Sequence, residues 1–375
     1  MRHDLAARTA TVERAVSDLV ALHSSDPVTV HLSAAARVEG FTPATLEDAL
    51  YERKTLLRML GMRRTLFVVP LDVAAIMDEA CTQALVPAQR RRLIAMIEEQ
   101  GIAKDGARWL DRASAATLEA LRARGEAAAA ELTKVVPQLR KKLVFGEGTA
   151  WAGEVGLSTR VLFLLATEGR IVRTRPRGTW VSGQYRWAEL ETWLGAVLPT
   201  VGPAEARAQL LRRWLWTFGP GTLADIRWWT GWTGVQAKAA LADVDAVGVD
   251  VGGHEAFVLP DDTDPVERPD PWARLLPGLD PTTMGWKERD WYLGPYADRL
   301  FDRNGNAGPT VWANGRVIGG WTQTADGRVV VRLLATADST TRTLVERERG
   351  RLEAWFGGTR IVPRFRTPLE RELAG

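Results

Sequence analysis

The chain has 375 residues, 46% of them hydrophobic, which is enough for two or three domains with separate small cores. Its formal net charge of +3 excludes a polycation, so any nucleic-acid surface must come from local clustering of basic residues. One cysteine excludes an intramolecular disulfide, and four scattered histidines do not supply zinc-finger spacing. No apolar signal core or membrane-length run is present, so we expect a cytoplasmic protein.

The first 112 residues are expected to fold as helices followed by strands. Apolar residues at helical or alternating spacing predict three helices and then a strand, over residues 11–22, 30–38, 42–50 and 65–69. Residues 71–112 are expected to be helical throughout. Helices followed by a β-hairpin are the order of a winged helix. We therefore assign residues 1–112 to a first winged-helix unit with a helical extension.

A second unit, residues 113–198, is expected to end in an arginine-rich hairpin. Its third helix should stop at Gly169, and residues 170–187 then contain five arginines, no carboxylate and two β-prone runs. We call this hairpin the wing. Arginines bind phosphates, so the wing predicts DNA contacts by Arg173, Arg175 and Arg177. The alternative is a solvent-exposed hairpin that only happens to be rich in arginine.

The same order of elements is predicted a third time, in residues 199–262. Thr222 is placed to cap a helix there, and two strands follow near residues 247–251 and 256–259. Residues 263–375 are expected to form a small β-rich domain with a helix over 339–356 and a last strand over 360–365. The predicted fold class is α+β, with three tandem winged-helix units and a β-rich C-terminal domain.

Several segments together resemble one family over almost the full length. They are Gly61-Met62-Arg63-Arg64-Thr65-Leu66, Gln184-Tyr185-Arg186-Trp187, Phe218-Gly219-Pro220-Gly221-Thr222-Leu223-Ala224-Asp225, Trp228-Trp229-Thr230-Gly231, Leu276-Pro277-Gly278-Leu279-Asp280-Pro281 and Pro309-Thr310-Val311 with Asn314-Gly315-Arg316-Val317. The chain thus resembles the AlkZ-like winged-helix family of bacterial DNA glycosylases. The resemblance implies three winged helices curved around duplex DNA, and cleavage of the bond between an alkylated purine and its sugar.

The resemblance also implies the partners of the protein. The substrate would be double-stranded DNA that carries bulky or crosslinked N7- or N3-alkylpurines, as in self-resistance to a genotoxin. No metal and no organic cofactor is implied. We expect a monomer associated with the nucleoid.

The catalytic motif of the family, Gln-x-Gln or Gln-x-Asp, matches a changed segment here. The chain has Leu22-His23-Ser24-Ser25-Asp26-Pro27, so His23 and Ser25 stand at the two motif positions. An alkylated purine is already cationic and leaves without a general acid, so the enzyme must stabilise the sugar cation and hold a water. We expect His23 and Ser25 to hold that water and Asp26 to supply negative charge.

Other interpretations of this segment stay open. His23 would end a helix, and Ser25 with Asp26 would cap the next one. Lys54 is the first lysine of the chain, so no local nucleophile offers a lyase step, and monofunctional hydrolysis is expected. The alternative function is a DNA- or lesion-binding protein without catalysis. A transcription regulator is disfavoured, because tandem wings in one chain lack the symmetry of palindrome-binding dimers.

Three further arginines are candidates for DNA contacts. Arg63 and Arg64 lie in the segment that resembles the Met-Arg-Gly-Thr of the family, and would contact the phosphate beside the lesion. A salt bridge between helix and strand is the alternative. Arg316 follows the hairpin signal Asn314-Gly315 and would enter a minor groove, unless the turn is only structural. We expect the tryptophans at 228, 229 and 232 to lie in a core.

Overall fold

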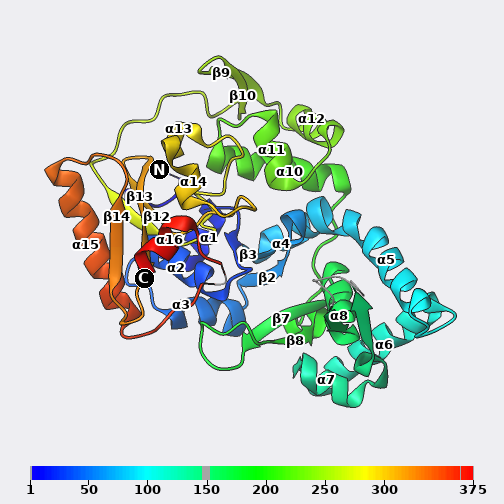
Figure 1. Ribbon diagram of the computed structural model, residues 1–375. Helices are drawn as coiled ribbons and strands as arrows, with labels where there is room; N and C mark the ends of the chain where they lie inside the picture. Colours follow the sequence, from blue (N-terminus) through cyan, green and yellow to red (C-terminus); the bar gives the residue numbers. More distant parts are fainter. Residues whose placement is uncertain (1, 146–152, 364, 375) are drawn as a thin grey trace.

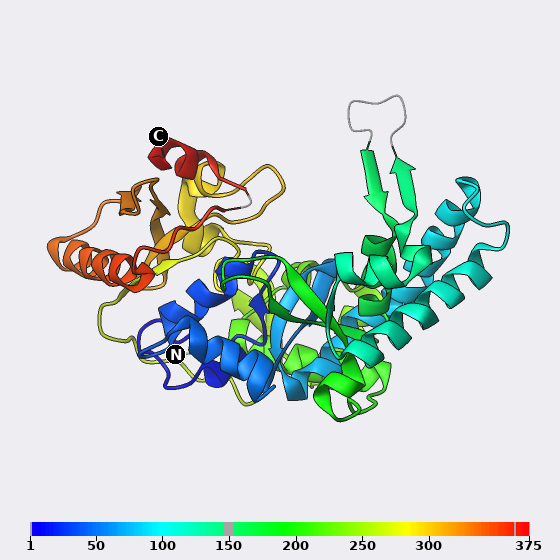
Figure 2. The same cartoon turned by 90° about the horizontal axis from the view of Figure 1, so that it is seen from below.

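The computed structural model describes residues 2–145, 153–363 and 365–374. The N-terminal elements lie in the middle of an elongated body, with the C-terminal sheet at one end and the helices between residues 86 and 167 at the other (Figures 1 and 2). None of the described helices is long and apolar enough to span a membrane. The chain combines helices with sheets whose described strands pair antiparallel, so the predicted α+β class agrees with the structure.

A three-stranded antiparallel sheet, in the order β1-β3-β2, organises the N-terminal region. Its elements are α1 (Val12–Asp18), β1 (Leu22–His23), α2 (Pro27–Arg37), α3 (Pro43–Glu47) with its π-helical continuation Asp48–Glu52, β2 (Leu56–Leu60) and β3 (Leu66–Pro70). The expected helix over 11–22 is wrong beyond Asp18, because Leu22 pairs with Val68 in the sheet. A short apolar run can be buried equally well in a helix or a strand, and here the ladder with β3 decides.

A chain of helices leaves this sheet, formed by α4 (Leu71–Met77), a π-helical turn Asp78–Thr82, α5 (Val86–Glu99) and α6 (Gly106–Arg124). The expectation of continuous helix over 71–112 is wrong at residues 100–105. Gly101 has a φ of 64°, and the Asp105 side chain accepts a hydrogen bond from the Arg108 amide to begin a new helix. The expected unit boundary at 112/113 therefore falls inside α6.

The region after α6 contains the predicted wing. Its elements are β4 (Ala127–Ala128), α7 (Ala129–Val135), β5 (Lys142–Phe145), β6 (Gly153–Gly156), α8 (Leu157–Thr167), β7 (Ile171–Pro176), β8 (Tyr185–Glu189) and α9 (Leu190–Leu194). The strands β7 and β8 pair antiparallel, which confirms the hairpin, and Gly169 takes a φ of 67° after α8. The β5–β6 pair projects from the body at the end away from the C-terminal sheet (Figure 2).

The next region comprises α10 (Pro203–Phe218), α11 (Leu223–Thr230), α12 (Gly234–Asp243), β9 (Val247–Val251) and β10 (His254–Val258). The predicted cap is confirmed, since the Thr222 hydroxyl accepts a hydrogen bond from the Asp225 amide at 3.1 Å. The predicted strands pair as a hairpin. Trp229 and Trp232 are buried, as expected of core residues, whereas Trp228 is only half-buried.

The C-terminal sheet has the order β11-β12-β13-β14, and α15 packs on it. The elements are β11 (Ala273–Leu276), α13 (Asp290–Leu293), α14 (Ala297–Leu300), β12 (Thr310–Ala313), β13 (Arg316–Gln323), β14 (Val329–Leu333), α15 (Ser339–Phe356) and α16 (Pro368–Ala374). Asn314 and Gly315 have φ values of 49° and 84°, which confirms the tight turn. The expected strand over 360–365 is wrong in its described part, because Pro363 cannot donate to a ladder.

Candidate active site

The segment from His23 to Pro27, which we call the motif loop, joins β1 to α2. The Ser24 amide donates to the Leu66 carbonyl at 2.7 Å, which fastens the loop to β3. The His23 ring lies edge-on to Phe67, with ring centroids 5.2 Å apart. The sheet, and not the end of a helix, therefore positions His23, and the interpretation of His23 as a helix terminus is wrong.

His23 is uncharged near neutral pH. Burial lowers the pKa of its imidazole to about 4, and the positive charge of Arg63 acts in the same direction. The Ser25 amide approaches the His23 Nδ1 at 3.4 Å, the upper limit for a hydrogen bond. A neutral imidazole has one N–H donor and one nitrogen acceptor.

Ser25 and Asp26 complete the loop. The Ser25 hydroxyl accepts a long hydrogen bond from the Leu66 amide at 3.4 Å, so its own O–H remains available as a donor. The Asp26 Oδ1 accepts a hydrogen bond from the Val28 amide at 3.0 Å and caps α2. The capping role considered for Asp26 is therefore confirmed, and the same hydrogen bond holds its carboxylate at the end of the motif loop.

An arginine cluster lies beside the motif loop. Arg63, in the turn between β2 and β3, places its guanidinium 4.1 Å from the Trp228 ring centroid, and Arg289 lies 4.7 Å from the same ring. Burial lowers the pKa of both arginines, and the charge of Arg289 lowers that of Arg63 further. Among the described residues no carboxylate forms an ion pair with either, so the salt bridge considered for Arg63 is not formed. Arg64 is exposed in the same turn, at a φ of 62°.

Arg289 is a member of this cluster that no sequence motif indicated. It lies in the irregular segment before α13, and its Nε donates to the Trp286 carbonyl at 2.7 Å. Its packing against Trp228, which Arg63 also contacts, brings it near Arg63. The two neighbouring tryptophans have different surroundings. Trp229 is buried in the core, whereas the Trp228 ring makes cation–π contacts with Arg63 and Arg289.

The wing arginines have partners within the protein. Arg175 donates to Glu47 at 2.6 Å and to Glu52 at 2.8 Å, and Arg177 forms an ion pair with Glu131. Arg173 lies over the Trp187 ring at 4.6 Å. These carboxylates come from other parts of the chain, which the local composition of the wing did not reveal. These carboxylates would compete with a phosphate for Arg175 and Arg177.

Arg316 lies apart from the cluster, in the C-terminal sheet. It is exposed at the start of β13, and its Nη1 donates to the Trp291 carbonyl at 2.9 Å. The structure therefore brings together His23, Ser25, Asp26 and Arg63. It places Arg316 and the wing arginines on other elements.

Known proteins resemble this chain in sequence and in fold. The family model described as "DNA glycosylase AlkZ-like" matches residues 16–355. Among solved structures, the Streptomyces sahachiroi DNA glycosylase AlkZ has a similar fold, with a TM-score of 0.73 and 20% sequence identity, covering 96% of this chain and 95% of that chain. A search of curated proteins found no match. The match over most of the chain shows that it belongs to the AlkZ-like DNA glycosylase family.

Proposed function

We propose that this protein is a monofunctional glycosylase that removes bulky or crosslinked N7- or N3-alkylpurines from double-stranded DNA. It acts as a monomer, through three winged-helix units, without a metal or organic cofactor. The observation that carries the proposal is an uncharged His23 on the motif loop, next to Ser25 and beside the Arg63 cluster. His23 and Ser25 are placed to hold a water, and the Arg63 cluster is placed to hold the DNA backbone beside it.

The reaction needs only a positioned water and a stabilised sugar cation. Water adds to C1′ of the sugar as the C1′–N bond breaks, and the bonding electrons leave with the purine, which becomes neutral. The added water becomes the C1′ hydroxyl and releases its second proton to the solvent. A glutamine amide offers such a water one donor group and one acceptor, and so does a serine hydroxyl. The neutral His23 imidazole offers the same pair when its Nδ1 exchanges the long hydrogen bond from the Ser25 amide for the water. The lowered pKa of His23 keeps the imidazole in this amide-like state. The Asp26 carboxylate adds negative charge near the developing cation.

The Arg63 cluster would hold the DNA backbone at the motif loop. The charge of Arg289 disfavours that of Arg63, and neither group forms an ion pair among the described residues, although the charge of the Asp225 carboxylate acts on Arg289. An anionic ligand is therefore favoured at Arg63. A phosphate would relieve the repulsion and accept hydrogen bonds from both. Arg64, exposed in the same turn, would add a further contact.

Exchanging both Arg63 and Arg64 for alanine should weaken DNA binding and reduce the salt dependence of the binding constant. The slope of log K against log salt should fall by about one for each phosphate contact that is removed, or by about two in total. The triple alanine variant of Arg173, Arg175 and Arg177 is the comparison. Its slope should fall by less than about three, because Arg175 and Arg177 already have carboxylate partners. Titrations of labelled duplex at several salt concentrations measure both slopes, and an unchanged slope in the first variant would contradict the assignment.

Titration of His23 should not change the rate of base release between about pH 5.5 and 8. The folded pKa of about 4 means that the imidazole gains its proton only as the pH falls toward that value, so the active neutral form persists above it. A histidine with an ordinary pKa of about 6.5 would instead lose about tenfold in rate per pH unit below that value. Single-turnover rates at saturating protein, measured across this range, distinguish the two profiles.

The direct test of the function uses duplexes that carry one defined N7-alkylguanine each, from a methyl adduct to a bulky or crosslinking one. Incubation with the protein should produce alkali-labile sites at the adduct and no strand break before alkali. Tight binding to adducted DNA without alkali-labile sites for any adduct would favour the alternative, a lesion-binding protein without catalysis.

A further inference from the structure

Arg58, on β2, is a buried cation without a carboxylate partner among the described residues. Its side chain is 2% exposed. The Nε donates to the Ser24 hydroxyl at 2.9 Å, and Nη1 donates to the Tyr51 hydroxyl at 2.7 Å. The guanidinium lies 4.5 Å from the centroid of the Tyr185 ring. Its two hydrogen-bond partners are neutral hydroxyls, and despite burial the pKa of Arg58 lies above its usual value, since the charge of the Glu47 carboxylate also acts on it.

The contact with Ser24 places Arg58 directly under the motif loop. Ser24 is fully buried between His23 and Ser25, and its amide is already held by the Leu66 carbonyl. The hydrogen bond from Arg58 holds the Ser24 hydroxyl as well, so the Ser24 side chain is also fixed. Ser24 thus anchors the loop at two points. Its neighbours on both sides can then project toward a substrate in a fixed geometry.

The wing encloses this contact from the outside. Tyr185 begins β8 and covers one side of the Arg58 guanidinium, while Arg175 of β7 lies 4.9 Å from the Tyr51 ring centroid. Arg175 also pairs with Glu47 and Glu52, on either side of Tyr51 in the sequence. Tyr51, Arg58 and Ser24 therefore form a connected path from the wing to the motif loop.

We propose that Arg58 is a positioning residue for base excision, which holds the motif loop through Ser24 while the wing holds Arg58. The proposal rests on the proposed function. In this proposal the wing contributes to the reaction by holding Arg58, whether or not the wing arginines contact phosphates. Arg58 itself is too buried to touch DNA.

A double-mutant cycle tests the contact. Ser24→Ala removes only the acceptor, and Arg58→Met removes the charge while filling a similar volume. Each single change should slow single-turnover base release about tenfold, and the double variant should also be about tenfold slower, because both changes break the same hydrogen bond. The dissociation constant for adducted duplex should change by less than about twofold, since the Arg63 cluster is intact.

Arg274→Met is the matched control. Arg274 is also a buried arginine, 6% exposed, but it lies in the C-terminal sheet and pairs with Glu348. Its loss should lower the melting temperature without slowing base release by folded protein. If Arg274→Met slows the reaction as much as Arg58→Met does, a general loss of packing explains both effects and the positioning role is wrong.

Two further outcomes overturn the proposal while leaving the proposed function intact. These are unchanged rates in folded Ser24→Ala and Arg58→Met, or a double variant about a hundredfold slower, as independent effects would give. A wild-type protein that releases no base would overturn the proposed function instead. In that case, the ¹⁵N chemical shifts of the His23 ring in the Ser24→Ala and Arg58→Met variants test whether Arg58 positions the motif loop. Equal shifts in the two variants support a loop held through Ser24, and unshifted signals exclude it.

Discussion

Asp280→Ala is expected to lower the free energy of unfolding by about 3–5 kcal/mol, because it leaves the Arg37 guanidinium as an uncompensated charge in the core. Arg37 and Asp280 are both fully buried and pair at 2.7 Å. Arg37 also donates to Thr282, and Asp280 accepts from Ser33 at 2.7 Å. Removal of the Asp280 carboxylate therefore breaks a network of hydrogen bonds. Urea denaturation of the wild-type protein and the Asp280→Ala variant measures the loss of free energy of unfolding.

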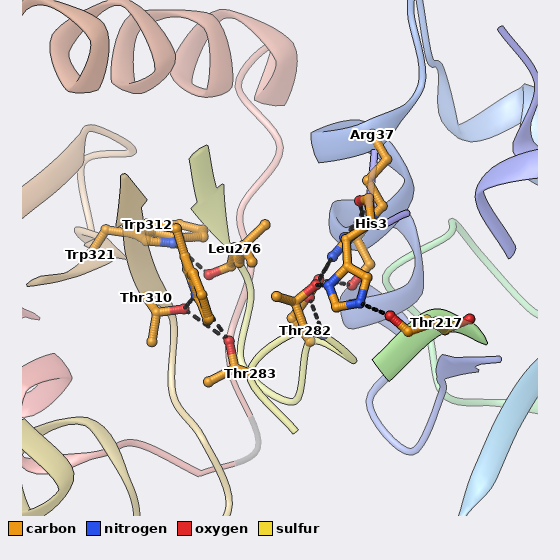
Figure 3. A network of polar contacts seen from close by, with 11 residues as sticks. His3, Arg37, Thr217, Leu276, Thr282, Thr283, Thr310, Trp312 and Trp321 are labelled. Atoms are coloured by element: carbon orange, nitrogen blue, oxygen red, sulfur yellow. Dashed lines mark hydrogen bonds and ion pairs between the residues drawn. The ribbon is translucent and has the colours of Figure 1, made fainter. Parts of the chain in front are cut away.

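This network joins the helix that begins at the motif loop to the C-terminal part of the chain. Figure 3 shows Arg37 beside His3 and Thr282, where the Thr282 hydroxyl lies 3.0 Å from the His3 ring and the other ring nitrogen 3.1 Å from the Thr217 carbonyl. Burial and the charge of Arg37 lower the pKa of His3 to about 4. The His3 ring is thus neutral and adds no second positive charge to the site of Asp280.

Glu346→Ala provides the control for the Asp280 variant. Glu346 also pairs with an arginine, Arg349, at 2.8 Å, but its side chain is 63% exposed on α15. An exposed pair contributes about 0–1 kcal/mol, so this variant should be nearly as stable as the wild type. Equal, small losses in both variants would show that the Arg37–Asp280 pair is hydrated, contrary to the structure.

His23→Ala is expected to reduce the single-turnover rate of base release by about 100- to 1000-fold, the usual effect of removing one positioned hydrogen-bonding group from an active site. His23→Gln should stay within about tenfold of wild type, because the amide restores one donor and one acceptor at the same position. It also restores the residue type that the family motif has there. Rates at saturating protein measure the chemical step alone.

His254→Ala is the matched control for the His23 variants, since this histidine is exposed on β10. Its rate should equal that of wild type. Affinity for adducted duplex should be similar in all these proteins, because His23 carries no charge near neutral pH. A His23→Gln variant as slow as His23→Ala, with normal DNA affinity, would exclude the amide-like role of the imidazole.

Local patterns predicted the elements that local interactions determine. The helix expected over 339–356 is α15, the hairpin at Asn314-Gly315 is confirmed, and Thr222 caps its helix. Each of these depends on residues within a few positions. The strand β1 was missed because its two residues owe their conformation to pairing with β3, more than forty positions later along the chain.

The candidate site was predictable only in part, for the same reason. His23, Ser25 and Arg63 were found through the motifs of the family, but Arg58 and Arg289 belong to no local pattern and are brought to the site by tertiary packing. The wing contained no carboxylate of its own, and its partners Glu47 and Glu52 precede Arg175 by 128 and 123 positions. Composition within a segment cannot reveal such partners.

Release of free alkylpurine from duplex DNA, detected by mass spectrometry, most directly tests whether the motif loop hydrolyses the glycosidic bond. Wild-type protein in excess over a duplex with a single N7-alkylguanine should release the intact alkylated base and leave an unbroken strand with an abasic site, much faster than the adduct is lost without protein. Adduct loss at the protein-free rate, with the DNA fully bound across the adduct series, would contradict a glycosylase function.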